Sequence, residues 1–170
     1  MHRDNERGFS LIELLIVVAI ILIIAAVAIP NLMRARMAAN EAGAAASVRT
    51  INTAQYAYQT KFANTPGLGY AANLTALGSP AVGICVQDVN GITGDCQLDN
   101  TLTSGTKSGY TFTTSVTVLG GFNTGYGVAA APTTPNQTGT RWFCSFQDAV
   151  VRGSTAVITA AGCNGTVNPL

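Results

Sequence analysis

One acidic side chain lies inside the longest apolar run of this 170-residue chain. From Phe9 to Ile29 there are 21 residues, and the carboxylate of Glu13 is the only formal charge among them. At about 1.5 Å of rise per residue, a helix of this length spans roughly 32 Å, which matches a bilayer core of about 30 Å. A carboxylate in lipid costs about 2.5 to 3.5 kcal/mol at mid-membrane and less near the edge, so such a residue normally has a partner. Glu13 is therefore the first candidate functional residue.

The cysteines are the second group of residues whose side chains could form bonds or bind a metal. Cys85, Cys96, Cys144 and Cys163 all follow the apolar run, and no pair has the C-x-x-C spacing of a metal or redox motif. The single histidine, His2, lies at the other end of the chain. Two disulfides are favoured over a metal site, and their position is typical of a segment exported into an oxidising compartment. We expect no metal ion and no cofactor.

Charge and acid content argue against several other classes of function. Nine basic and eight acidic residues give a net charge of +1, so no nucleic-acid footprint is visible and no nucleic-acid partner is expected. Trp142 and Phe146 beside Arg141 and Arg152 could form a base-stacking platform, but alternating aromatics in a strand are more often core. The acids beyond the apolar run form no compact catalytic motif; they are Glu41, Asp88, Asp95, Asp99 and Asp148.

The loop between Cys85 and Cys96 has a partial likeness to a calcium loop, because Asp88 begins a run of oxygen-bearing side chains at alternate positions. The glycine required at the sixth position is Thr93, and the bidentate glutamate of the twelfth is Asp99. A tight Asn-Gly turn inside a disulfide-closed loop is the favoured interpretation, and such a disulfide would stabilise the fold by roughly 3 kcal/mol.

One long helix must position Glu13. Pro30 should kink or locally melt this helix without ending it. No further proline occurs before Phe62, alanine is abundant, and helical spacing predicts a face that packs on a sheet through Val48, Ile51, Ala54, Gln55, Tyr58 and Phe62. Tyr56, Tyr58 and Phe62 are interpreted as core and helix surface in preference to an aromatic path for electron transfer.

The rest of the chain predicts an antiparallel sheet. Residues 63–106 are a connector rich in turn residues, with a short helical turn at Asn73 to Leu77. Strands are expected at Gly109 to Leu119, Gly125 to Ala131, Thr140 to Gln147 and Asp148 to Ile158, with turns at Gly120-Gly121 and near Gly153-Ser154. Short connectors make these strands antiparallel.

Side-chain alternation predicts which strand residues are buried. In the first strand the buried face is expected to carry Tyr110, Phe112, Val116 and Val118, with polar Thr114 as the exception. In the third strand, Trp142, Cys144 and Phe146 share one face, which we expect to cover the helix. Three Asn-x-Thr triplets match the glycosylation pattern but carry little weight; they begin at Asn73, Asn136 and Asn164.

The residues Gly8-Phe9-Ser10-Leu11-Ile12-Glu13, the apolar helix after them and Pro30 resemble the class III signal of type IV pilins and pseudopilins. In that family a membrane peptidase cuts after the glycine on the cytoplasmic side and methylates the new amino terminus. The resemblance implies that Gly8 ends a leader, that Phe9 becomes the N-methylated first residue and that Glu13 becomes the fifth. The leader has zero net side-chain charge, whereas family leaders are usually basic.

The resemblance also implies an α+β pilin fold in which a long helix packs on an antiparallel sheet head. The expected parts are a leader (1–8), a transmembrane and assembly helix (9–30), its amphipathic half (31–62) and a head (63–170). The head would contain a connecting loop (63–106), a sheet (107–158) and a disulfide-closed tail. Cys85 with Cys96 and Cys144 with Cys163 is the preferred pairing because both loops are local, and a C-terminal disulfide is common in the family.

The implied function is structural: a single-pass inner-membrane prepilin, with a cytoplasmic N-terminus and an exported head, that polymerises into an extracellular pilus or a periplasmic pseudopilus. Implied partners are other copies of the chain, the prepilin peptidase, an assembly platform with its ATPase, and membrane lipid. The alternatives are a type II secretion pseudopilin or a minor pilin with an adhesive or DNA-uptake head. Cleavage at Gly8 would remove the only histidine, so no enzyme is expected.

Cleavage at Gly8 would give Glu13 a partner. It creates a positively charged amine on Phe9, and an ion pair between this amine and Glu13 of a neighbouring copy would neutralise both charges in a low-dielectric core.

Two observations disagree on the orientation of the helix in the membrane. Arg34 and Arg36 after the helix favour the opposite topology under the positive-inside rule, whereas the cysteines favour an exported head. We give the cysteines more weight.

Overall fold

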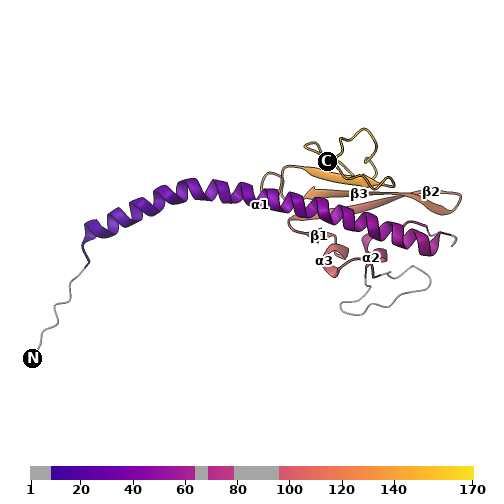
Figure 1. Ribbon diagram of the computed structural model, residues 1–170, viewed down its shortest axis with the longest axis horizontal. Coiled ribbons are helices and arrows are strands. Elements are labelled where there is room, and N and C mark those ends of the chain that lie inside the picture. Colours follow the sequence, from indigo (N-terminus) through magenta and orange to yellow (C-terminus); the bar gives the residue numbers. More distant parts are fainter. Residues whose placement is uncertain (1–8, 64–68, 79–95) are drawn as a thin grey trace, which may run out of the picture. The chain divides into compact units, whose positions relative to one another are not determined.

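The computed structural model describes residues 9–63, 69–78 and 96–170. Three helices and five strands occur there: α1 (Leu11–Phe62), α2 (Leu74–Leu77), α3 (Asn100–Thr103), β1 (Thr106–Lys107), β2 (Tyr110–Leu119), β3 (Phe122–Pro132), β4 (Trp142–Phe146) and β5 (Arg152–Ser154) (Figure 1). The chain divides into two compact units, residues 1–36 and residues 37–170, and α1 contributes to both. The predicted α+β class is confirmed.

The five strands form one sheet in the order β1-β2-β3-β4-β5, and every neighbouring pair is antiparallel. The predicted glycine turn joins β2 to β3: Gly120 and Gly121 have φ values of 61° and 80°, which glycine adopts without steric cost. A register shift between Thr117 and Val118 disturbs the pairing near this turn. Despite this shift, the hairpin of β2 and β3 is the longest pairing in the sheet.

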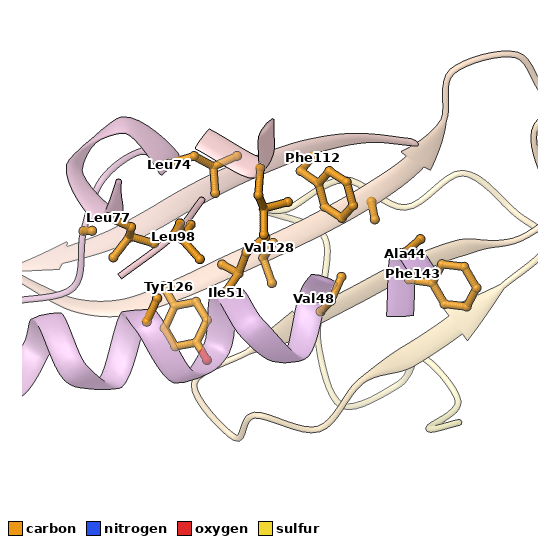
Figure 2. Packing of buried hydrophobic residues seen from close by; sticks show 14 of the residues in the cluster. Ala44, Val48, Ile51, Leu74, Leu77, Leu98, Phe112, Tyr126, Val128 and Phe143 are labelled. Carbon is orange, nitrogen blue, oxygen red and sulfur yellow. The ribbon is translucent and has the colours of Figure 1, made fainter. Parts of the chain in front are cut away.

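The second half of α1 covers one face of this sheet. The predicted face is confirmed, since Val48, Ile51, Ala54, Gln55, Tyr58 and Phe62 are all buried. Figure 2 shows Val48 and Ile51 on the helix beside Val128, Tyr126 and Phe112 on the strands. Leucines from α2, α3 and the segment between them complete this core at Leu74, Leu77, Leu98 and Leu102. Burial of this apolar cluster, at about 25 cal/mol per Å², is the main stabilising contribution to the head.

Two buried amides fix the position of the helix on the head. Gln55 is fully buried, donates to the carbonyl of Ala71 at 3.0 Å and accepts from the Ala71 N–H at 2.8 Å. Asn52 donates to Ser145 Oγ at 2.9 Å and accepts from the hydroxyl of Tyr126 at 3.1 Å. Because unpaired buried amides are costly, these bonds define one register of α1 against the sheet.

The C-terminal tail covers the opposite face of the sheet. Ala129 and Cys144 from the strands pack with Ala160 and Cys163 from the tail in a second apolar cluster, flanked by Phe146, Ile158 and Val167. The head therefore has three layers: helix, sheet and tail. Figure 1 shows the yellow tail and the magenta part of α1 on either side of the strands.

The expected face of β4 was wrong because of this third layer. Phe143 and Ser145 point to the helix, where Phe143 joins the main core and Ser145 bonds Asn52. Cys144 and Phe146 belong to the tail side of the sheet. Alternation separated the two sets correctly, but a strand that is covered on both faces gives no signal for which set meets the helix.

Other boundaries also differ from the expectation. Gly153 and Ser154 lie inside the three-residue strand β5 and do not form a turn. Val118 is 61% exposed, because β2 extends beyond the core as it approaches the hairpin turn. The strand β1 and the helix α3 were not expected as separate elements, whereas α2 matches the predicted helical turn, with Asn73 as its N-cap.

Candidate functional site

The first part of α1 is an apolar helix without side-chain burial. Every large apolar residue from Phe9 to Met33 is at least 46% exposed, and the most apolar window has none of its residues buried. By length and composition this helix can cross a membrane. An apolar surface of this extent in water is strongly unfavourable, so the segment requires lipid or other protein helices around it.

Glu13 lies in the first turn of this helix and has a local hydrogen bond. Its Oε2 accepts from the backbone N–H of Ser10 at 3.0 Å, and α1 begins at the next residue. This is the acidic half of a capping box, in which a glutamate at the third helical position satisfies the N–H of the cap residue. The bond therefore holds the carboxylate beside Ser10, the residue that directly follows Phe9.

Ser10 is the residue of this site that sequence reasoning missed. The Ser-x-x-Glu spacing of Ser10 and Glu13, directly before an apolar run, is the signature of a helix N-terminus and was readable. A negative charge there also interacts favourably with the helix dipole, typically by about 0.3 to 1 kcal/mol. The carboxylate therefore stabilises the first turn in addition to any contact it makes with another chain.

The processing residues are only partly described. Phe9 is 80% exposed, whereas Gly8 lies outside the described residues. Pro30 lies within α1, and the helix continues beyond it to Phe62. Proline in a helix interior removes one backbone hydrogen bond and costs about 3 kcal/mol, so its place here requires support from surrounding contacts. Cleavage, methylation and a kink at these positions remain predictions.

The cysteine predictions have different outcomes. Cys144 and Cys163 form a disulfide with a Cα–Cα distance of 5.9 Å, which joins β4 to the tail. Cys96 is disulfide-bonded, and its predicted partner Cys85 lies outside the described residues. The second pairing therefore stays a prediction.

Glycine at position 127 is needed beneath the tail, since a Cβ there would lie 2.1 Å from the carbonyl oxygen of Ala160.

Two carboxylates of the head, those of Asp99 and Asp148, form local ion pairs. Asp99 accepts from Lys107 at 2.7 Å, and this bond and those from Thr101 and Leu102 lower the pKa of Asp99 to about 2. Burial alone would raise the pKa of Asp148, but hydrogen bonds from the side chain of Arg152 and from a backbone N–H outweigh it and hold that pKa below its ordinary value. Both pairs join residues that are close in sequence and stabilise the local structure of the head.

The aromatic residues of the head are packing elements. Tyr58 and Phe62 are buried with ring centroids 4.6 Å apart, as the core interpretation predicts. Tyr56 is 38% exposed and meets Tyr70 and Tyr126 edge-on at 6.1 and 6.3 Å. Burial raises the pKa of Tyr126, whose hydroxyl donates to Asn52.

The arginines that suggested a stacking platform are held within the head. The guanidinium carbon of Arg152 lies 4.5 Å from the centroid of Phe146, and that of Arg141 lies 5.5 Å from the centroid of Phe143. Within the described ranges no group of three potential metal-ligating side chains occurs. The calcium-like segment that begins at Asp88 lies outside those ranges.

The comparisons with known proteins concern the same N-terminal segment. A family model described as the prokaryotic N-terminal methylation motif matches residues 3–29. Over 37 residues the chain is 68% identical to the type IV wide pilus major component PilA4 of Thermus thermophilus. The matched segment is 22% of this chain and 28% of that protein. These matches support membership of the type IV pilin family.

A second relative extends the similarity along α1. The chain is 44% identical over 54 residues to the type IV major pilin protein PilA of Myxococcus xanthus, which is 32% of this chain and 24% of that pilin. The matched part thus spans about a quarter of the length of these pilins. No solved structure matches the chain significantly. The described residues combine a long apolar helix with an antiparallel sheet, which is a pilin-like α+β architecture.

Proposed function

We propose that this chain is the subunit of a type IV pilus-like filament. It is inserted in the inner membrane through α1 with its N-terminus in the cytoplasm, cut after Gly8, N-methylated at Phe9 and then polymerised through the same helix. Neighbouring copies replace the lipid around the apolar segment. The observation that carries the proposal is the complete exposure of the apolar window of α1, with its single carboxylate in the first turn.

Glu13 has a proposed role in register. The amine that cleavage creates on Phe9 would pair with Glu13 of a neighbouring copy, and leaving either charge unpaired in the filament core would cost several kcal/mol. Helical polymers form when heterologous contacts do not close into a ring, so each copy would supply an amine to one neighbour and a carboxylate to another. The prepilin peptidase and an assembly platform with its ATPase are the further partners proposed.

Mass spectrometry of the purified chain tests the processing step. A mature chain that begins at N-methylated Phe9 supports the proposal, whereas an intact Met1 leaves a simple membrane anchor as the alternative. The measurement uses the full chain expressed with a type IV prepilin peptidase. Omission of the peptidase is the control, and the leader should then remain attached.

A pair of substitutions separates the charge of Glu13 from its hydrogen bond. Glu13→Gln keeps an oxygen that can accept from Ser10, because glutamine also completes a capping box, but it removes the charge. Glu13→Ala removes both. We expect processing to continue and filament yield, counted by electron microscopy of sheared cells, to fall in both variants.

The glutamine variant decides the interpretation. If Glu13→Gln gives a normal filament yield while Glu13→Ala does not, Glu13 acts through the helix cap and the proposed charge pair is wrong. Ser10→Ala is the matched control, because it leaves the charge and the Ser10 backbone N–H in place. Its filament yield should remain close to that of the unmodified chain.

A further inference from the structure

We propose that Asn164 is a site of intramolecular deamidation, in which the backbone nitrogen of Gly165 attacks the side-chain amide of Asn164. The reaction needs no enzyme and depends on the residue that follows the asparagine. Glycine lacks the side chain that obstructs this attack, so an Asn-Gly pair on a surface turn is the most susceptible arrangement. The structure places this pair in the tail, next to Cys163 and its disulfide to Cys144.

The turn leaves both reacting groups accessible. Asn164 and Gly165 are exposed, and a Cβ added to Gly165 would meet nothing within 4 Å. The carbonyl of Asn164 accepts from the N–H of Val167 at 3.2 Å, which closes a four-residue turn. In the part of the chain that the structure describes, no hydrogen bond uses the N–H of Gly165. That nitrogen can therefore lose its proton to solvent.

Two donors already point at the oxygen on which negative charge develops. Oδ1 of Asn164 accepts from the backbone N–H of Thr166 at 3.0 Å and from its hydroxyl at 2.5 Å. Attack on Cγ converts this carbonyl oxygen into an oxyanion, which both donors stabilise. Donors placed at a developing oxyanion lower the barrier of acyl transfer in the same way at enzyme sites.

The steps balance without an oxidant or a cofactor. The Gly165 nitrogen gives its proton to water or hydroxide and forms a bond with Cγ. Nδ2 then takes a proton from water as the Cγ–Nδ2 bond breaks, and it leaves as ammonia. The product is a five-membered succinimide. Water opens it at either carbonyl, which leaves aspartate or isoaspartate at position 164.

The product would change the character of a surface groove. A groove of about 310 Å³ lies between the β2–β3 hairpin and the tail, and Asn164 and Gly165 line it together with Ser115, Thr117 and Phe146. All of its lining residues are uncharged. Deamidation places a carboxylate there, and the isoaspartate form also lengthens the backbone beside Cys163.

Asn73 is an internal comparison, because its side-chain oxygen also accepts from one hydroxyl and one backbone N–H. Its Oδ1 accepts from the hydroxyl of Thr75 at 2.6 Å and from the N–H of Ala76 at 2.8 Å. The residue that follows it, Leu74, is buried and belongs to α2. Its side chain and the helix prevent the approach of the Leu74 nitrogen, so Asn73 should remain an amide.

The experiment incubates the full chain in detergent at mildly alkaline pH and follows each asparagine by peptide mass spectrometry. We expect the conversion of Asn164, with isoaspartate among its products, to proceed much faster than that of Asn73. Gly165→Ala should slow it several-fold. Thr166→Val removes the hydroxyl donor and should slow it by about fivefold to tenfold, since tenfold in rate corresponds to about 1.36 kcal/mol.

The contrary outcomes are equally distinct. Equal rates at Asn164 and Asn73, or an unchanged rate in Gly165→Ala, would exclude the proposed attack. A rate in Thr166→Val at or above that of the unmodified chain would overturn the role of the two donors. An intact Cys144–Cys163 disulfide, measured on the same samples, shows that the tail has stayed covalently joined to β4 throughout.

Discussion

At the residue scale, Glu13 serves two different demands. In the single chain its carboxylate accepts from the N–H of Ser10 and completes the first turn of α1. In the proposed filament this carboxylate would also form an ion pair with the Phe9 amine of a neighbouring copy. A carboxylate has two oxygens and about four lone-pair sites, so both contacts are chemically compatible. The cap would hold the carboxylate in place before the partner arrives, which reduces the ordering cost of the pair.

Asn52 is a buried polar residue whose replacement should destabilise the head. It is 3% exposed and bonds Ser145, Tyr126 and the carbonyl of Ala149. Asn52→Leu keeps a similar volume but leaves those groups unpaired, and we expect the free energy of unfolding to fall by about 2–3 kcal/mol. Urea unfolding in detergent, followed by the fluorescence of Trp142, measures the loss.

The control for this variant is Thr53→Ala on the exposed side of the same helix. The Thr53 hydroxyl bonds the carbonyl of Arg49 within α1, so its removal should change stability by less than about 0.5 kcal/mol. Equal losses in the two variants would mean that the buried amide network does not determine the result, because both substitutions raise helix propensity.

At the element scale, the sequence was informative wherever one face of an element was buried. Helical spacing identified the face of α1 because its opposite side is exposed, and the β2–β3 turn was readable from two adjacent glycines. In β4 both faces are covered, so alternation could not say whether Phe143 or Cys144 meets the helix. The packing of the tail on the sheet could not be predicted from periodicity, because the tail has no regular secondary structure. It is held by the Cys144–Cys163 disulfide and by a small apolar cluster.

Two glycines should respond to alanine in opposite directions. A Cβ at Gly127 would lie 2.1 Å from the carbonyl oxygen of Ala160 and 3.0 Å from Ser115 Oγ, so Gly127→Ala must displace the tail. We expect a loss of about 1–3 kcal/mol, typical of overpacking. A Cβ at Gly43, in the helix, would meet Ser108 at 3.6 Å, which is an ordinary contact.

Gly43→Ala should therefore stabilise the head by about 0.5–1 kcal/mol, because alanine loses less backbone entropy in a helix. Urea unfolding of both variants measures the difference, and hydrogen exchange of residues 156–167 reports whether the tail detaches in Gly127→Ala. A destabilised Gly43→Ala would mean that α1 needs flexibility at this position. An unchanged Gly127→Ala would contradict the close approach of the tail to β3.

At the scale of the whole molecule, the chain divides into a unit without a core and a unit with one. Residues 37–170 contain the buried clusters, whereas the large apolar residues from Phe9 to Met33 are exposed. Hydropathy predicted the apolar membrane helix from Phe9 to Ile29, which ends before this boundary. Hydropathy could not predict what surrounds the exposed helix, because that depends on lipid or on other chains, which a single chain does not contain.

Co-expression of two versions of the chain tests those contacts. In the proposed filament each copy offers its Phe9 amine to one neighbour and Glu13 to another, so a Glu13→Gln copy lacks only one of its two pairs. We expect tagged Glu13→Gln subunits to form few filaments alone but to enter filaments of the unmodified chain below their expressed proportion. Immunogold labelling and quantitative mass spectrometry of sheared filaments measure this fraction in cells that carry a prepilin peptidase and pilus assembly machinery.

A subunit that offers neither group is the control that separates charge pairing from simple helix packing. A Glu13→Gln copy whose Gly8 is also replaced to block cleavage has no free Phe9 amine, and it should be excluded from mixed filaments. A blocked copy that retains Glu13 shows the effect of the uncut leader alone. If the Glu13→Gln copy with a normal leader is processed yet excluded as completely as the double variant, its remaining amine has no pairing value. The apolar surface of α1, and not an ion pair between copies, would account for assembly if the Glu13→Gln copy instead entered mixed filaments in its expressed proportion.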